Sequence, residues 1–254
     1  MNQKIALITG ASAGIGHQTA LIMAQNNFNL ILTGRRKERL ESIKKHLESN
    51  FDCKVLILSF DIRKRSAVEN ALSSLPEEWK AIDVLINNAG LAAGVGPVNT
   101  ADVDDWENMI DTNIKGLLYT TRIVSPWMVK RHSGHIINLS SIAGKEVYPN
   151  GSVYCGTKHA VAAITQAMRI ELMPSGIKVT SIAPGAVETE FSLVRFRGDE
   201  EKAAQVYKGF TPLSAKDIAE TILFVVTRPA HVNINDLLIM PTNQASARDF
   251  NREQ

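Results

Sequence analysis

The sequence contains few cysteines, no long apolar run and almost no net charge. Its two cysteines, Cys53 and Cys155, are too few for a disulfide framework, so we expect a cytoplasmic protein. No run of about 18 apolar residues occurs, so we expect no membrane-spanning helix. The start, MNQKIALITG, lacks a basic region followed by a long apolar one, so we expect no signal peptide. A net charge of +2 gives no reason to expect nucleic acid or a membrane as a partner.

The sequence does contain a regular alternation of apolar runs and helical patterns. Seven apolar runs of strand length occur, from KIALITG and FNLILTG to INDLLIMP. Between them we count six helices, the longest over residues 101–131, with Asp102 or Asp104 available to cap its start. Apolar strands that alternate with helices indicate a parallel sheet covered on both faces. We therefore predict one α/β domain over residues 1–254, a Rossmann-type doubly wound parallel sheet of about seven strands.

One segment, residues 188–212, breaks this alternation. It is polar and aromatic, contains FSLVRFRGDEEKAAQVYKGF, and lies between a strand and the last helix. An insertion at such a place is typical of functional loops, so we expect a substrate lid there.

Two other features have ordinary structural explanations. The run RRKERLESIKKH could suggest nucleic acid, but Glu38 and Glu41 are spaced for ion pairs on one helix face, which favours a solvated helix. His132 and His135 are too few to predict a metal site, and we expect no metal ion.

A glycine-rich turn lies between the first strand and the first helix. Gly10, Gly14 and Gly16 allow a tight turn and the close approach of a ligand. The N-terminus of the following helix offers free N–H groups to a phosphate. The spacing G-x-x-x-G-x-G differs from the common dinucleotide fingerprint, and a turn without a ligand is the alternative. Its position after the first strand of a βαβ unit favours a dinucleotide.

The end of the second strand, LTGRR, indicates which dinucleotide. Gly34 stands where an NAD site usually has an acid, and Arg35 and Arg36 follow it. The planar arginine fork suits a phosphate, which favours NADP. The alternative is that both arginines belong to the solvated face of a charged helix.

In the stretch VYCGTK, Tyr154 and Lys158 are four residues apart and therefore share one helix face. An ammonium group beside a phenol lowers the phenol's pKa and makes it a working acid or base. A surface pair on an ordinary helix is the alternative, and the pair alone does not decide. We interpret Cys155 as packing on another face of this helix rather than as a nucleophile.

Six motifs occur in order, and together they resemble the short-chain dehydrogenase/reductase family. The motifs are TGASAGIG at 9–16, NNAG at 87–90, Asn113 in DTNIKG, INLSS at 137–141, Tyr154-x-x-x-Lys158 and PGAVET at 184–189. The resemblance extends to about residue 240. It implies an enzyme that transfers hydride to or from a nicotinamide cofactor.

The resemblance also implies residue roles. Tyr154 protonates a carbonyl oxygen or acts as the base in reverse, and Lys158 lowers its pKa and holds the nicotinamide ribose. Ser141 polarises the same oxygen, and Asn113 positions a water that relays protons to Lys158. Ala13 stands where some NADP-using relatives have a basic residue, so phosphate binding relies on the two arginines and Ser12. The implied cofactor-binding residues are Gly10, Ser12, Gly14, Ile15, Gly16, Arg35, Arg36, Asp61 (beside the adenine), Asn88, Ala89, Gly90, Tyr154, Lys158, Pro184, Gly185, Val187 and Thr189.

Longer stretches are similar to a narrower group, the NADP-dependent 3-hydroxy acid dehydrogenases. These stretches are TEFSLVRFRGDEEKAAQVY, RPAHVNINDLLIMPTNQA and DWENMIDTNIKGLLY. The similarity implies a small hydroxy acid as substrate, of the serine, allo-threonine or 3-hydroxypropionate type, and a homotetramer. A reductase of sulfoacetaldehyde or of neutral ketones and diketones is the alternative. A non-catalytic NADP-binding protein is disfavoured, because the sequence retains Asn113, Ser141, Tyr154 and Lys158.

An acid substrate needs a cation, and the candidates are Arg195 and Arg197 in the 188–212 segment and Lys145 after the strand of Ser141. We favour Arg195, which Val194 and Phe196 flank. Arginine suits the forked contact with a carboxylate or sulfonate. We expect Arg195, Ser141 and Tyr154 to contact the substrate. A solvent-facing arginine or an intersubunit salt bridge is the alternative for Arg195.

Overall fold

A seven-stranded parallel sheet forms the centre of the molecule, in the order β3-β2-β1-β4-β5-β6-β9. The computed structural model describes residues 3–253. Each strand coincides with one of the apolar runs, so the predicted number of strands and their parallel pairing are confirmed. The strands are β1 (Ile5–Ile8), β2 (Asn29–Gly34), β3 (Val55–Ser59), β4 (Ile82–Asn87), β5 (His135–Leu139), β6 (Lys178–Pro184) and β9 (Asp236–Ile239).

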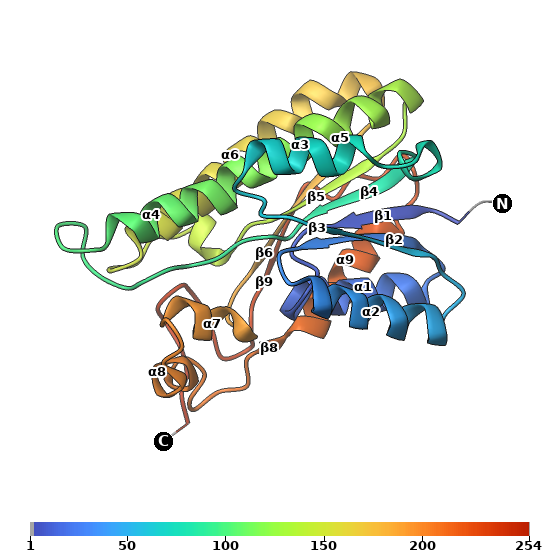
Figure 1. Ribbon diagram of the computed structural model, residues 1–254. Helices are drawn as coiled ribbons and strands as arrows, with labels where there is room; N and C mark the ends of the chain where they lie inside the picture. Colours follow the sequence, from blue (N-terminus) through green and yellow to red (C-terminus); the bar gives the residue numbers. More distant parts are fainter. Residues whose placement is uncertain (1–2, 254) are drawn as a thin grey trace.

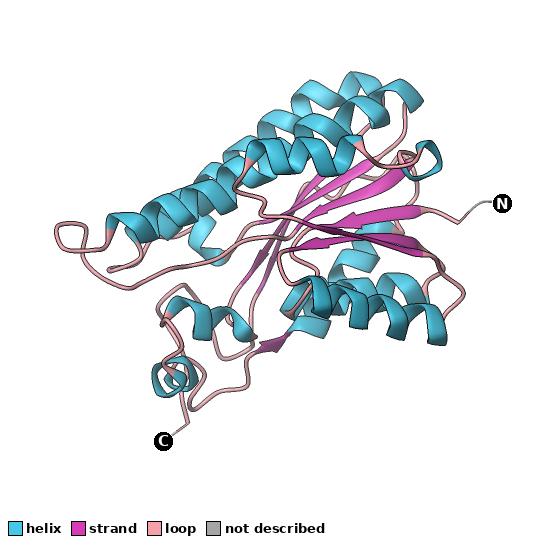
Figure 2. Cartoon of the chain, in the orientation of Figure 1, coloured by secondary structure: helices cyan, strands magenta, loops and turns pink. Residues whose placement is uncertain are grey.

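Helices cover both faces of the sheet, as Figures 1 and 2 show. One face carries α1 (Gly14–Gln25), α2 (Lys37–Asn50) and α9 (Ala215–Val226). The other carries α3 (Arg65–Ser73), α5 (Leu117–Arg131) and α6 (Ser152–Leu172). A separate apolar cluster fills the space between each helical layer and the sheet. The doubly wound α/β fold predicted from the sequence is therefore confirmed.

The predicted count of six helices is too low, because residues 3–253 form nine α-helices. The helix predicted over residues 101–131 forms two of them, α4 (Val103–Ile110) and α5, and the 188–212 segment forms two more that were not expected, α7 (Glu190–Arg195) and α8 (Glu200–Gln205). Helices of six residues span less than two turns, which is too short to show apolar periodicity. None of the helices formed by the described residues combines the length and apolarity that crossing a membrane requires.

The long helix predicted over residues 101–131 is interrupted. It consists of α4 (Val103–Ile110), a π-helical turn (Asp111–Gly116) and α5. Asp102 caps α4, as predicted, because its carboxylate accepts a hydrogen bond from Asp104 N at 3.0 Å. Short strands β7 (Val187–Glu188) and β8 (Leu213–Ser214) pair with each other and join the two ends of the 188–212 segment.

The strand order reverses between β1 and β4, and ligands of open α/β sheets bind at such a switch point, beside the carboxyl ends of the strands. Thr9 and Asn88 hold this point together. The backbone N–H groups of Asn88 and Ala89 each donate to Thr9 Oγ1 at 3.0 Å, and Asn88 Nδ2 donates to Thr9 O at 2.8 Å. The glycine turn after β1 and the NNAG stretch after β4 are therefore fixed relative to each other.

A buried polar network connects the sheet to the α5–α6 layer. Asn87 Nδ2 donates to Asn138 Oδ1 at 2.8 Å and to Thr121 Oγ1 at 3.0 Å. Asn138 Nδ2 donates in turn to Thr165 Oγ1 at 2.9 Å. Buried polar groups need such partners, since an unpaired one costs the full free energy of its desolvation. The network fixes how the two central strands and two helices meet next to the site.

Replacing Asn138 by Ala is expected to lower the free energy of unfolding by about 2–3 kcal/mol, because it leaves buried partners of the network without hydrogen bonds. The matched control is Asn70→Ala, which changes an exposed asparagine on α3 and is expected to cost less than about 0.5 kcal/mol. Urea unfolding followed by circular dichroism measures both. Equal, small losses in the two variants would contradict a stabilising network.

Candidate active site

Tyr154 and Lys158 lie near the start of α6, and both side chains are buried, with 8% and 6% of each residue exposed. Lys158 Nζ donates a hydrogen bond to the carbonyl oxygen of Leu139 at 2.8 Å, at the carboxyl end of β5. The same Nζ lies 6.0 Å from the centroid of the Tyr154 ring. This burial rules out an ordinary surface pair. Cys155 is also buried and packs in a small apolar cluster, as predicted.

Burial controls the acid–base properties of this pair. It raises the pKa of Tyr154 well above the ordinary value of about 10, and Tyr148 adds to the rise while Ser141 and Arg195 oppose it. Burial also lowers the pKa of Lys158 to about 8. The shift of Tyr154 is therefore upward, opposite to the direction expected from Lys158 alone. The reason is that burial disfavours the charged form of both groups.

Ser140 and Ser141 follow β5, and their environments differ. Ser140 is buried, and its hydroxyl donates to the carbonyl oxygen of Lys158 at 3.2 Å. Ser141 is half-buried; its hydroxyl accepts from Ala143 N at 3.1 Å and lies 3.5 Å from the carbonyl oxygen of Pro184. Ser140 therefore holds α6 against the sheet, whereas Ser141 is the serine whose hydroxyl acts on Tyr154. This difference favours Ser141 as the substrate-polarising serine.

Asn113 lies in the π-helical turn, and its side chain has a full set of partners. Its Nδ2 donates to Leu91 O at 2.9 Å and to Thr157 Oγ1 at 3.0 Å, and its Oδ1 accepts from Leu91 N at 2.8 Å. The role predicted for Asn113, positioning a water that relays protons to Lys158, stays a prediction. Gly90 lies between the two groups: a Cβ there would be 3.3 Å from Asn113 Oδ1 and 3.5 Å from Lys158 Nζ.

The glycine turn has the shape of a cradle. Gly10 and Gly14 have φ angles of +66° and +53°, in the region that disfavours side chains. A Cβ on Gly16 would lie 2.5 Å from Asn88 Nδ2 and from Gly10 O, so only glycine fits there. Helix α1 begins at Gly14 without a side-chain cap, so its first N–H groups are available to an anion. These features fit the pyrophosphate of a dinucleotide. Ile15 packs partly against the core below the turn.

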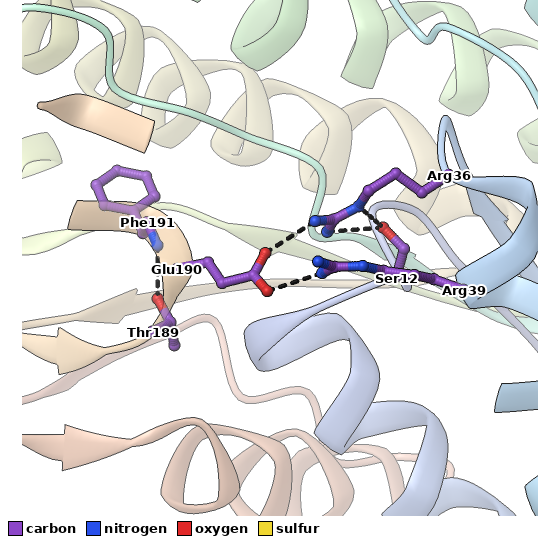
Figure 3. Close-up of polar contacts among 6 residues, drawn as sticks. All are labelled: Ser12, Arg36, Arg39, Thr189, Glu190 and Phe191. Atoms are coloured by element: carbon purple, nitrogen blue, oxygen red, sulfur yellow. Dashed lines mark hydrogen bonds and ion pairs between the residues drawn. The ribbon is translucent and has the colours of Figure 1, made fainter. Parts of the chain in front are cut away.

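Two arginines beside this turn converge on one carboxylate, as Figure 3 shows. Arg36 Nη1 and Arg39 Nη1 bind the two oxygens of Glu190 at 2.8 Å and 2.7 Å. Arg36 also donates through Nε and Nη2 to Ser12 Oγ, at 3.1 Å and 3.0 Å. The structure thus joins the predicted Ser12 and Arg36 and adds Arg39, whereas the Arg35 side chain takes no part in these contacts. A forked anion-binding site of this kind fits a phosphate.

The remaining predicted cofactor residues line the same edge of the sheet. The Asp61 carboxylate accepts from Arg63, and this hydrogen bond holds the pKa of Asp61 below its ordinary value. Pro184 ends β6, and Gly185 N donates to Ile239 O at 2.7 Å. After Val187 the chain returns to the glycine turn, where Thr189 would lie 3.4 Å from a Cβ on Gly14.

Arg195 is the last residue of α7, and its guanidinium lies against two tyrosines. Its Cζ is 5.5 Å from the centroid of the Tyr148 ring and 5.9 Å from that of Tyr154. Its Nε is buried without a hydrogen-bond partner, and its Nη1 lies 3.4 Å from the Tyr148 hydroxyl. Among residues 3–253 it forms no salt bridge. Contact with Tyr154 rules out a purely solvent-facing arginine.

A cavity of about 580 Å³ lies next to Tyr154 and Arg195. Its wall includes Arg197, which bridges Asp102 at 2.7 Å and Asp105 at 2.8 Å. The backbone N–H of Gly94 donates to Arg195 O at 3.1 Å, so the 188–212 segment is joined to the opposite wall.

Sequence reasoning missed four residues of the site: Arg39, Tyr148, Glu190 and Phe191. The Phe191 ring lies 5.8 Å from the Tyr154 ring. Tyr148 contacts Arg195, and Glu190 binds Arg39 together with Arg36. The available signals were weak: Arg39 is one helical turn beyond Arg35 and Arg36, and Glu190 directly follows the PGAVET motif. No motif spacing relates these residues to their partners.

We compared the sequence and the structure with those of known proteins. The sequence profile described as short chain dehydrogenase matches residues 4–199. The chain belongs to the short-chain dehydrogenase family. The NADP-dependent 3-hydroxy acid dehydrogenase YdfG of Salmonella typhi is 49% identical over 244 residues, which cover 96% of this chain and 97% of that protein. An NADP-dependent 3-hydroxy acid dehydrogenase of Schizosaccharomyces pombe is 46% identical over 255 residues and matches 100% of this chain and 98% of that protein.

Two solved structures of serine dehydrogenases resemble this short-chain dehydrogenase. A closed form complexed with NADP⁺ superposes with a TM-score of 0.91 at 46% identity, covering 98% of this chain and 100% of that chain. Serine dehydrogenase from Escherichia coli gives a TM-score of 0.82 at 43% identity, covering 95% and 99%. The family membership predicted from the motifs is therefore confirmed, and the protein is an oxidoreductase of this family.

The raised pKa of Tyr154 predicts how the dehydrogenase titrates without added cofactor. Because burial holds the phenol protonated, tyrosinate absorbance at 295 nm should rise identically in wild type and Tyr154→Phe up to about pH 10. A step near pH 7–8 that disappears in the variant would show instead that Lys158 outweighs burial.

Proposed function

We propose that the protein is an NADP(H)-dependent oxidoreductase that interconverts a small 3-hydroxy acid and its oxo form. The observation that carries this proposal is the guanidinium of Arg195, which lies beside Tyr154 with its Nε buried and no carboxylate partner among the described residues. A buried N–H group without an acceptor is costly, and a substrate carboxylate would supply the acceptor that Arg195 Nε lacks. The similarity to proteins named 3-hydroxy acid and serine dehydrogenases supports the same substrate class.

The cofactor choice rests on Arg36, Arg39 and Ser12. Their side chains meet at one point beside the glycine turn, where an adenosine 2′-phosphate would find two guanidinium groups and a hydroxyl. An NAD site would instead need an acid at the end of β2, where this chain has Gly34. NADP is named for the relatives in the comparisons, which supports the same choice.

When bound, the cofactor supplies the nicotinamide carbon that gives or takes the hydride. The chain supplies the proton chemistry. For reduction, the raised pKa of Tyr154 keeps its phenol protonated and ready to donate to the forming alkoxide. Ser141 adds a second hydrogen bond to that oxygen, and Arg195 orients the substrate through its carboxylate. Oxidation runs through the same groups in reverse, with Lys158 fixed against Leu139 O beneath them.

A sulfonate is the second candidate for the acid group, because the Arg195 fork would bind the oxygens of isethionate or sulfoacetaldehyde in the same way. A neutral ketone would leave Arg195 without a partner in a closed site, which disfavours a carbonyl reductase for uncharged substrates.

We also propose that residues 1–254 form one domain in which the 188–212 segment acts as a substrate lid. The segment contains Arg195 and contacts both walls of the site: Glu190 binds Arg36, and Arg197 binds Asp102 and Asp105. An ion-paired closure of this kind would shield the hydride transfer from water.

The assembly we propose is a homotetramer in the cytoplasm. Two separate apolar surfaces are exposed: Ile110 and Leu118 on the α4–α5 side, and Phe224 with Leu238 at the α9–β9 edge. A tetramer with two-fold symmetry needs two different self-complementary interfaces, and these surfaces would provide them. The two cysteines are free and buried, which fits a reducing compartment.

Replacing Arg195 by Ala tests the substrate class. We expect KM for L-serine or 3-hydroxypropionate to rise about 30- to 100-fold, the equivalent of one lost charge-assisted contact of about 2–3 kcal/mol. KM for a neutral diketone should change little. Steady-state kinetics on both substrates measures this difference. An equal loss on both would remove the carboxylate role of Arg195.

Phe224→Asp and Leu118→Asp test the assembly. Each places a charge in one proposed interface, so each variant should run as a dimer where the wild type is a tetramer. Light scattering after gel filtration measures the mass, and circular dichroism checks that both variants fold. A wild-type monomer, or tetramers in both variants, would contradict the proposal.

A further inference from the structure

Glu190 occupies the anion-binding site formed by Arg36 and Arg39. Its two carboxylate oxygens bind one guanidinium each, at 2.8 Å and 2.7 Å, and Arg36 is held from the other side by Ser12 (Figure 3). The two arginines keep the pKa of Glu190 below its ordinary value, so it is ionised at neutral pH. These are the side chains to which the proposed function assigns the 2′-phosphate. One site therefore faces two anions, one from the chain and one from the cofactor.

Glu190 also begins the helix that carries the substrate-binding arginine. The six residues of α7 run from Glu190 to Arg195, and Thr189 caps the helix by accepting from Phe191 N at 3.2 Å. Phe191 packs against the Tyr154 ring at 5.8 Å, and Arg195 lies 5.9 Å from the same ring. A change at Glu190 thus acts on the element that shapes the substrate site.

We propose that Glu190 is an internal competitor of the cofactor's 2′-phosphate, and that NADP(H) binding releases the start of α7 by displacing it from Arg36 and Arg39. A dinucleotide without the 2′-phosphate leaves the Glu190 contacts in place. Glu190 thereby lowers the affinity for NADP(H) and couples the phosphate site to α7. This inference rests on the proposed function for the position of the 2′-phosphate.

The expected change in NADP(H) affinity depends on how exposed the ion pairs of Glu190 are. The side chains of Arg36, Glu190 and Arg39 are 42%, 45% and 50% exposed, so their ion pairs are weak and open readily. A phosphate, with more charge and three oxygens, outcompetes a carboxylate for two arginine forks. Removing the competing charge is therefore worth about a fivefold change in affinity, and the change shrinks as salt is added.

The test compares Glu190→Gln with a matched control, Glu188→Gln. Glu188 lies two residues away, is exposed and forms no salt bridge among residues 3–253, so the control removes the same charge without breaking an ion pair. Calorimetry measures the Kd of NADP⁺, NAD⁺ and adenosine 2′,5′-bisphosphate. In Glu190→Gln, we expect the two ligands with a 2′-phosphate to bind about fivefold tighter at low salt, and NAD⁺ to be unchanged. Glu188→Gln should match the wild type for all three. Unchanged or weaker NADP⁺ binding in Glu190→Gln would overturn the proposal.

Hydrogen exchange reports on the release of α7 in the wild type. Adenosine 2′,5′-bisphosphate should speed the exchange of the amides of residues 190–195, whereas adenosine 5′-monophosphate should not. Equal exchange with both ligands would contradict the coupling.

A further variant separates this inference from the proposed function. Arg39→Ala should weaken NADP⁺ binding and leave NAD⁺ unchanged. If NADP⁺ binding is unaffected, the 2′-phosphate binds elsewhere, and the proposal that Glu190 competes with it is wrong. None of these measurements uses turnover of a hydroxy acid, so they test the competition at the phosphate site separately from the proposed substrate class.

Discussion

The site depends on the hydrogen bonds that join the ends of β1 and β4. Thr9 accepts three of these bonds, two from Asn88 and one from Ala89, and they fix the glycine turn against the NNAG stretch at the point where the strand order reverses. Gly16 fits against Asn88 only because it has no side chain. The same edge of the parallel sheet receives Ser141 from β5 and the PGAVET stretch from β6. The binding and catalytic groups are therefore brought together by one constraint, which is that parallel strands end at the same edge.

Charge pairing gives this edge its chemical character. Three cations line the cavity or its rim: Arg197 binds Asp102 and Asp105, Lys202 binds Asp199, and Arg195 has no carboxylate partner among the described residues. At the start of α7, the single carboxylate of Glu190 pairs with both Arg36 and Arg39. Among the cations that line the cavity, Arg195 beside Tyr154 is the one without a carboxylate partner in residues 3–253. A substrate anion would supply that partner.

Much of this structure could be predicted from the sequence because apolar runs and glycine motifs are local signals. The seven strands, the glycine turn and the placement of Tyr154 with Lys158 follow from such signals. The short helices α7 and α8 could not be recognised, since six residues carry little periodicity. The pairing of Glu190 with Arg39 spans 151 residues and leaves no trace in spacing. The upward pKa shift of Tyr154 arises from burial, which a sequence does not reveal.

We propose that Arg195 and Tyr154 together make this chain an NADP-dependent dehydrogenase of small hydroxy acids. The most direct measurement follows nicotinamide absorbance with purified protein, NADP⁺ or NAD⁺, and L-serine, L-allo-threonine, 3-hydroxypropionate or isethionate, with NADPH and a neutral diketone as the control. The account predicts turnover of at least one of these acids, with NADP⁺ well above NAD⁺. Turnover of the diketone alone would contradict it, because the proton chemistry of Tyr154 would then operate without an anion on Arg195.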